Sequence, residues 1–176
     1  MSNRTTEDGF SLIELLIVVA IIGIIAAIAI PSLLRARISA NEAAAIGDIR
    51  TVISSEAAYH ASNGGMYDLL SCLAAPSGCI PGYPATAPTF LDPQIASLTA
   101  KQGYDRLFTP GVPPAVLPSS FSPSSIPNYA YVAVPTSSNT GVRGFAGDAS
   151  GRICQTMNGT DPAAGTSSLA VGCAPL

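Results

Sequence analysis

Residues 9 to 34 have the sequence GFSLIELLIVVAIIGIIAAIAIPSLL, in which Glu14 is the only charged side chain. As a helix, the stretch from Phe10 to Leu34 would be roughly 37 Å long, because an α-helix rises about 1.5 Å per residue. That length spans a bilayer with some tilt. The helical pattern continues through Pro31, and no small-residue cleavage site follows the apolar core. We therefore expect the segment to be retained as a membrane helix.

The composition of the chain excludes several classes of function. Its 176 residues are enough for one domain, and eight basic against eleven acidic side chains make it mildly acidic. Lys101 is the single lysine, and the sequence has no basic cluster that could neutralise a row of phosphates, so we expect no direct nucleic-acid partner. A catalytic triad, a paired-carboxylate cleft, a phosphate loop and a cluster of metal ligands are also unrecognisable in the sequence. We expect no catalytic residues, no cofactor and no metal site.

The cysteines all follow the membrane segment, at Cys72, Cys79, Cys154 and Cys173. None of them forms the C-x-x-C pairs that are typical of zinc or redox sites. An even number on one side of the membrane segment indicates disulfides formed in an oxidising compartment. Three pairings are possible, and proximity in the sequence favours Cys72 with Cys79 and Cys154 with Cys173.

Two segments flank the apolar stretch. Residues 1 to 9 are polar and without periodicity, and we interpret them as a leader peptide. In residues 35 to 62 the helix continues but becomes amphipathic. Its apolar positions are Ile38, Ala45, Ile46, Ile49, Ile53 and Ala57. Mostly on other faces lie the polar positions, Arg37, Asn41, Glu42, Asp48, Arg50 and Glu56. The run Asn63-Gly64-Gly65 should end the helix, because glycine adopts the left-handed conformation found at helix ends.

Two residues should weaken this long helix. Pro31 lacks an amide donor and its ring clashes with the preceding turn. Gly23 is a second soft point within the apolar stretch, because glycine is a poor helix former. We expect a kink or local melting near both residues, so the sequence predicts flexibility there.

The rest of the chain has no helix-length period. Residues 63 to 127 hold most of the prolines, and we expect ordered loops or edge structure pinned by the first cysteine pair. Residues 128 to 176 contain three strand patterns, at 128–134, 141–147 and 151–157, with a turn at 148–151 between the last two. The prediction is an α+β fold, in which a small antiparallel sheet with long loops packs its one buried face on the amphipathic half of the helix.

The stretch from Gly9 to Gly23 resembles the class III signal of type IV pilins and type II secretion pseudopilins. The resemblance continues to about Tyr59, through Pro31 and the run RARISANE at 35–42, and is strongest to a bacterial type IVa major pilin. It implies the pilin fold. It also implies that a membrane prepilin peptidase cleaves between Gly9 and Phe10 and methylates the new amine of Phe10. Glycine suits such a substrate, because its backbone can lie close against a protease cleft.

Glu14 is the residue that distinguishes an assembling subunit from a plain membrane anchor. An ionised carboxylate within hydrocarbon costs several kcal/mol, and such residues usually have a partner or a function. The resemblance implies that Glu14 pairs with the amine of Phe10 on a neighbouring subunit and so sets the register of assembly, a use of buried charge that favours specificity over stability. The alternative is a Glu14 that lies near the headgroups and is merely solvated.

The function implied by the resemblance is that of a structural subunit of a type IV pilus, a homo-oligomeric helical filament. An inner-membrane assembly platform and an ATPase-driven machinery would be its partners. The alternatives are a type II secretion pseudopilin or minor pilin and, in another class, a membrane-anchored binding domain. Adhesion, motility, DNA uptake and secretion are not distinguished by the sequence.

The implied location is the bacterial inner membrane for a single-pass precursor, and an extracellular pilus after assembly. The resemblance and the cysteines place the leader in the cytoplasm and the remaining domain in the periplasm. The charges do not support this orientation. Arg4 in the leader is offset by Glu7 and Asp8, and Arg35 and Arg37 at the far end oppose it by the positive-inside rule.

Four further patterns have ordinary structural interpretations. We expect His60 to be a polar surface residue, and Asp148, Ser150 and Gly151 to form a hairpin turn instead of a calcium loop. The triplet Asn158-Gly-Thr160 fits a glycosylation site, but three-residue matches are common by chance. Tyr129 and Tyr131 share one strand face and should pack there.

Overall fold

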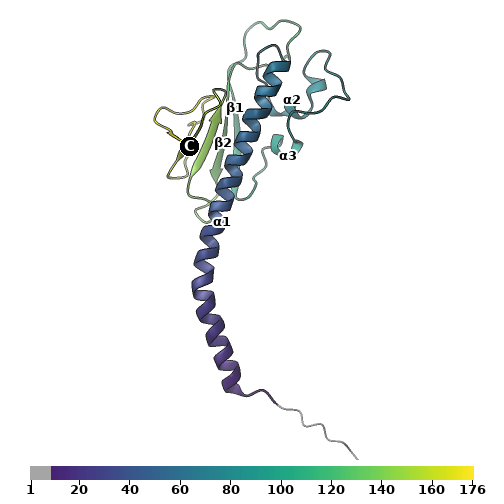
Figure 1. Ribbon diagram of the computed structural model, residues 1–176. Coiled ribbons are helices and arrows are strands. Elements are labelled where there is room, and N and C mark those ends of the chain that lie inside the picture. The colour runs from purple at the N-terminus through teal and green to yellow at the C-terminus, as the bar shows by residue number, and fades with distance from the viewer. Residues whose placement is uncertain (1–8) are drawn as a thin grey trace, which may run out of the picture. The chain divides into compact units, whose positions relative to one another are not determined.

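The computed structural model describes residues 9 to 176, so residues 1 to 8 of the predicted leader lie outside the described residues. Two compact units are distinguished, Met1–Arg37 and Ile38–Leu176. The helices are α1 (Leu12–Ser62), α2 (Leu70–Ala74), the 3-10 helix η1 (Pro76–Gly78) and α3 (Pro93–Ala96). The strands are β1 (Tyr104–Pro110), β2 (Tyr129–Pro135), β3 (Gly144–Asp148), β4 (Ile153–Thr156) and β5 (Ala174–Pro175) (Figure 1). The predicted α+β class is confirmed.

Helix α1 is continuous over 51 residues and contributes to both units. Gly23 and Pro31 both lie within it, and neither interrupts the helix. Flexibility at these two residues stays a prediction. The helix ends where the sequence indicates, since Gly64 and Gly65 have positive φ values of 62° and 91° and the amide of Gly65 donates to the carbonyl of His60 at 2.9 Å.

The sheet has five antiparallel strands in the order β1-β2-β3-β4-β5, where three were predicted. The three predicted strands correspond to β2, β3 and β4. Strand β1 comes from the proline-rich region, and it lies at the edge of the sheet and ends at Pro110, a position that tolerates proline. The turn between β3 and β4 is as predicted, because the amide of Gly151 donates to the carbonyl of Asp148 at 2.9 Å and Gly151 has a φ of 78°.

Strand β2 is buried on both of its faces, which corrects the prediction of a single buried face. One face packs on the part of α1 after Ile38 (Figure 1). The main core between them contains Ile49, Val52, Tyr59, Tyr104, Tyr129, Tyr131 and Phe145. A second, smaller cluster on the other face consists of Ala130, Val132, Ala146 and Ala163, with Leu169 against it. The C-terminal segment thus returns over the sheet, which no strand pattern could indicate.

The buried face of α1 also differs from the predicted one. Its buried residues are Glu42, Ala45, Ile49, Val52, Ser55, Glu56 and Tyr59. Most of them recur at alternating intervals of three and four, so they lie on one stripe of the helix. Glu42 and Glu56 were expected on other faces because they are charged, and Ala57, expected on the apolar face, is exposed. The spacing of three and four residues correctly predicts one buried stripe on the helix. The expectation that charged residues lie outside the stripe and apolar residues inside it is wrong for Glu42, Glu56 and Ala57.

Candidate functional site

The surface of α1 between Leu12 and Leu34 is apolar on every side. The exposed fractions of its large apolar side chains run from 46% at Val18 to 81% at Leu12. The helix is long and apolar enough to cross a membrane. A helix that is apolar all round is stable only when hydrocarbon or other protein surrounds it. This segment therefore needs either a bilayer or another protein surface around it.

A capping box closes the N-terminal end of this helix. Because α1 begins at Leu12, Ser11 is the N-cap residue and Glu14 is the third residue of the first turn. The amide of Ser11 donates to Oε2 of Glu14 at 2.9 Å, and the amide of Glu14 donates to the hydroxyl of Ser11 at 3.3 Å. Each side chain thus satisfies an amide that would otherwise lack a partner. Our sequence reasoning missed this box, although its signal, a serine three residues before a glutamate, was present.

The predicted cleavage site lies just before the capped end. Gly9 and Phe10 precede the helix, and both are exposed, with 76% of Phe10 accessible. A Cβ atom added to Gly9 would meet no described atom within 4 Å. Packing within residues 9 to 176 therefore does not require a glycine here. A requirement of a processing enzyme remains a sufficient reason for it.

Glu14 has no cationic partner among residues 9 to 176. One carboxylate oxygen, Oε2, accepts from Ser11, and the other, Oε1, is left without a donor in that part of the chain. The carboxylate is therefore held in place by its own helix while one oxygen can still accept from a group outside it. A positive group for Glu14 therefore has to come from outside residues 9 to 176.

The other predicted site residues lie apart from this end of the helix. Gly23 has open space around it, since an added Cβ would meet no described atom within 4 Å. The cysteines form two disulfides in the unit from Ile38 onward, Cys72–Cys79 and Cys154–Cys173. The first closes a short loop around α2 and η1. The second ties β4 to the C-terminal segment.

The residues given ordinary structural interpretations are accounted for by local contacts. The ring of His60 lies 4.6 Å from that of Tyr67. Asp148 Oδ1 accepts from the amide and hydroxyl of Ser150 within the hairpin turn. Residues 9 to 176 contain no group of three or more His, Cys, Asp and Glu side chains that could hold a metal.

The remaining two patterns lie on β2 and in a surface turn. Tyr129 and Tyr131 are buried in the main core. Asn158 is exposed, and its amide oxygen accepts from the hydroxyl of Thr160 at 2.7 Å. Nothing in these contacts indicates a second functional site.

Comparison with known proteins identifies the N-terminal signal. Residues 4 to 30 match the family model of the prokaryotic N-terminal methylation motif. The match includes Gly9, Phe10, the capping box and most of the apolar helix. It indicates a prepilin signal of the kind found in type IV pilins and pseudopilins, and it fits a precursor in the inner membrane. No curated protein and no solved structure matches the chain.

Proposed function

We propose that this chain is a structural, non-catalytic subunit of a type IV pilus. It is cleaved between Gly9 and Phe10, N-methylated at Phe10 and assembled into a helical filament through α1. The observation that carries the proposal is the methylation motif at residues 4–30, which continues into an apolar helix with no buried side. Such a helix suits two successive environments, because hydrocarbon and a bundle of identical helices both cover it completely.

The precursor is a single-pass protein of the inner membrane with its leader in the cytoplasm. The prepilin peptidase removes the leader, and an assembly platform with its ATPase transfers the subunit into the filament. The unit Ile38–Leu176 lies in the periplasm and then outside the cell. Its two disulfides favour this side, because such bonds form and persist in oxidising compartments.

Glu14 acts during assembly as the partner of the Phe10 amine on a neighbouring subunit. The capping box supports this role, because it holds the carboxylate at the end of the helix where cleavage releases the amine. The free oxygen Oε1 can accept a hydrogen bond from the amine while Oε2 keeps the hydrogen bond from Ser11. Repetition of this head-to-tail contact gives an open helical assembly.

A type II secretion pseudopilin or a minor pilin is the alternative function. The methylation motif is common to pilins and pseudopilins, so it does not decide between them. Two local disulfides favour a filament that is exposed outside the cell, where a subunit needs covalent staples. A membrane-anchored binding domain is the weaker alternative, because a simple anchor does not need the charge of Glu14 within the apolar segment.

The test is mass spectrometry of the mature protein from its host, combined with microscopy and analysis of sheared surface fibres. The expected N-terminus is N-methylated Phe10, and the expected location is the sheared fibre. A methylated protein that is missing from the fibres would favour the pseudopilin or minor pilin. An uncleaved or unmethylated N-terminus would refute the pilus subunit as well as the pseudopilin or minor pilin. A host that lacks the peptidase is the control, and it should keep the leader.

A further inference from the structure

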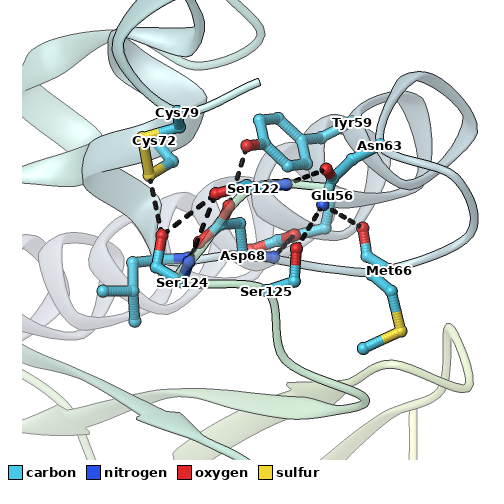
Figure 2. The surroundings of a disulfide bond; sticks show 11 residues. Glu56, Tyr59, Asn63, Met66, Asp68, Cys72, Cys79, Ser122, Ser124 and Ser125 are labelled. Carbon is cyan, nitrogen blue, oxygen red and sulfur yellow. Dashed lines mark hydrogen bonds between the residues drawn. A yellow bond between two sulfur atoms is a disulfide. The ribbon is translucent and has the colours of Figure 1, made fainter. Parts of the chain in front are cut away.

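Six polar side chains are fully buried where α1 ends, and we call them the polar junction. They are Glu56, Tyr59, Asn63, Asp68, Ser122 and Ser125, each with an exposed fraction of 0%. Three belong to α1 and the turn after it, one to the segment before α2, and two to the loop before β2 (Figure 2). The junction thus joins three parts of the chain that are distant in sequence.

Most members of the polar junction have hydrogen-bond partners. Asn63 donates to the hydroxyl of Ser125 at 2.8 Å and accepts from the amide of Ser122 at 2.9 Å (Figure 2). Asp68 accepts from the hydroxyl of Tyr59 and from the amide of Leu69, both at 2.8 Å. Each carboxylate oxygen of Asp68 therefore has a hydrogen-bond donor.

Glu56 is the exception within the junction. Its Oε2 accepts only a long hydrogen bond of 3.5 Å, from the amide of Asp68. Its Oε1 is buried and has no partner among residues 9 to 176. A carboxylate in this position would be a buried charge without compensation, which is far more costly than a buried neutral acid.

No lysine or arginine among residues 9 to 176 pairs with Glu56. On its own helix it faces Tyr59, and the next segment contributes Tyr67 and Asp68. His60, near the end of the same helix, packs its ring 4.6 Å from that of Tyr67. From the sheet it is near Tyr129, while Asp148 at the end of β3 lies near the same tyrosines. None of the four ion pairs in the described chain involves Glu56. Asp68 instead adds a negative charge next to it.

We infer that Glu56 is a proton-binding site, and that the bound proton holds the polar junction closed. The side chain is a neutral carboxylic acid in the folded protein and ionises only when the junction opens. Loss of the proton would place two carboxylates side by side in the buried polar junction. Opening would release the end of α1 from the segment before α2 and from the loop before β2.

The pH range in which stability changes follows from the direction in which folding shifts the pKa of Glu56. The pKa of Glu56 is raised from its ordinary value of 4.5 to about 9, chiefly by burial; the hydrogen bond from the amide of Asp68 opposes this rise, and the charge of Asp68 adds to it. Between these two values the folded protein keeps a proton that the unfolded chain loses. Stability therefore falls as the pH rises through this range, by about tenfold in the unfolding equilibrium constant per pH unit.

The test compares wild type with Glu56→Gln, which has the same shape and cannot ionise. Full-length protein in detergent, with its disulfides intact, is unfolded with denaturant at about pH 6, 7 and 8. The unfolding constant of wild type should rise about tenfold per pH unit more steeply than that of the variant. Parallel pH curves would overturn the inference. Asp105→Asn removes an exposed carboxylate and should keep the slope of wild type.

An infrared spectrum tests the same inference without unfolding. Folded wild type at about pH 7 should show the carbonyl band of a protonated carboxylic acid, and Glu56→Gln should lack it. Absence of the band in wild type would refute the neutral Glu56. If Asp68→Asn removes the band and Glu56→Gln keeps it, the proton is on Asp68 and the assignment is wrong. If Glu56→Gln does not fold, wild type and Asp68→Asn still decide whether the band exists and whether it belongs to Asp68.

Discussion

Two glutamates on one face of α1, Glu42 and Glu56, show that the groups around a buried side chain decide whether it is charged. Glu42 and Glu56 are both buried, with exposed fractions of 6% and 0%. Burial raises the pKa of the Glu42 carboxyl, but hydrogen bonds from the Arg143 side chain and from the amides of Val142 and Arg143 outweigh it. The result is a pKa below the ordinary value of 4.5. No cation among residues 9 to 176 compensates Glu56, so there the burial effect prevails.

Glu42→Gln should lower the free energy of unfolding by about 2 kcal/mol at about pH 7, because it removes charge-assisted hydrogen bonds to Arg143. A carboxyl whose pKa is lowered by folding stabilises the protein above its unfolded pKa, and this contribution is lost as the pH falls through the folded pKa. The difference in free energy of unfolding between variant and wild type should therefore be smaller at about pH 3 than at about pH 7. Denaturant unfolding of full-length protein at both pH values measures it. An equal difference at both would show that the charge of Glu42 contributes nothing.

At the scale of elements, helix α1 approaches the sheet closely at one glycine of β3. A Cβ atom on Gly147 would lie 2.6 Å from Cγ2 of Ile49 and 2.7 Å from Cδ1 of Ile53. These distances are well below an ordinary contact, so the glycine sets the separation between helix and strand. The close contact with α1 at Gly147 contributes to the burial of β3, which is buried along its whole length.

Gly147→Ala should destabilise the protein by about 1–3 kcal/mol, because the methyl group overpacks the contact with α1. Ile53→Val removes the Cδ1 atom that would lie 2.7 Å from the added Cβ and should recover part of this loss in the double variant. Gly47→Ala is the matched control, since Gly47 lies on α1 with no described atom within 4 Å of an added Cβ. The control should be neutral or stabilise by up to about 1 kcal/mol. If thermal unfolding shows that Gly147→Ala is as stable as the control Gly47→Ala, the tight contact between helix and strand is contradicted.

Two units of different chemistry make up the whole molecule. Residues 10 to 34 of the first unit expose almost only apolar side chains, while the unit from Ile38 has its own core, sheet and disulfides. Neither unit alone meets the requirements of a filament subunit, because assembly needs the first and a soluble, folded surface needs the second. The proposed assembly therefore requires that the signal, the helix and the folded domain belong to one chain.

Two substitutions of Glu14 separate its proposed charge pair from its capping role. Glu14→Gln keeps a side chain that can complete the capping box but loses the charge, whereas Glu14→Ala loses both. If the charge pairs with the Phe10 amine, both variants should be processed normally and yield at least about tenfold fewer filaments, since an unpaired buried charge costs several kcal/mol. Sheared filament yield and mass spectrometry of Phe10 measure this. Normal yield from Glu14→Gln with loss in Glu14→Ala would assign the effect to the cap.

The sequence alone determined the apolar helix, its end at Gly64 and Gly65, the prepilin signal, the α+β class and three of the strands. These features depend on neighbours in the chain, so periodicity and turn residues suffice to find them. Only the tertiary structure decided that β1 joins the sheet, that the C-terminal segment covers its second face, and that Glu42 and Glu56 point inward. Whether a buried carboxyl is charged depends on the groups that other segments bring to it, and Arg143 and Asp68 reach these glutamates only when the chain folds.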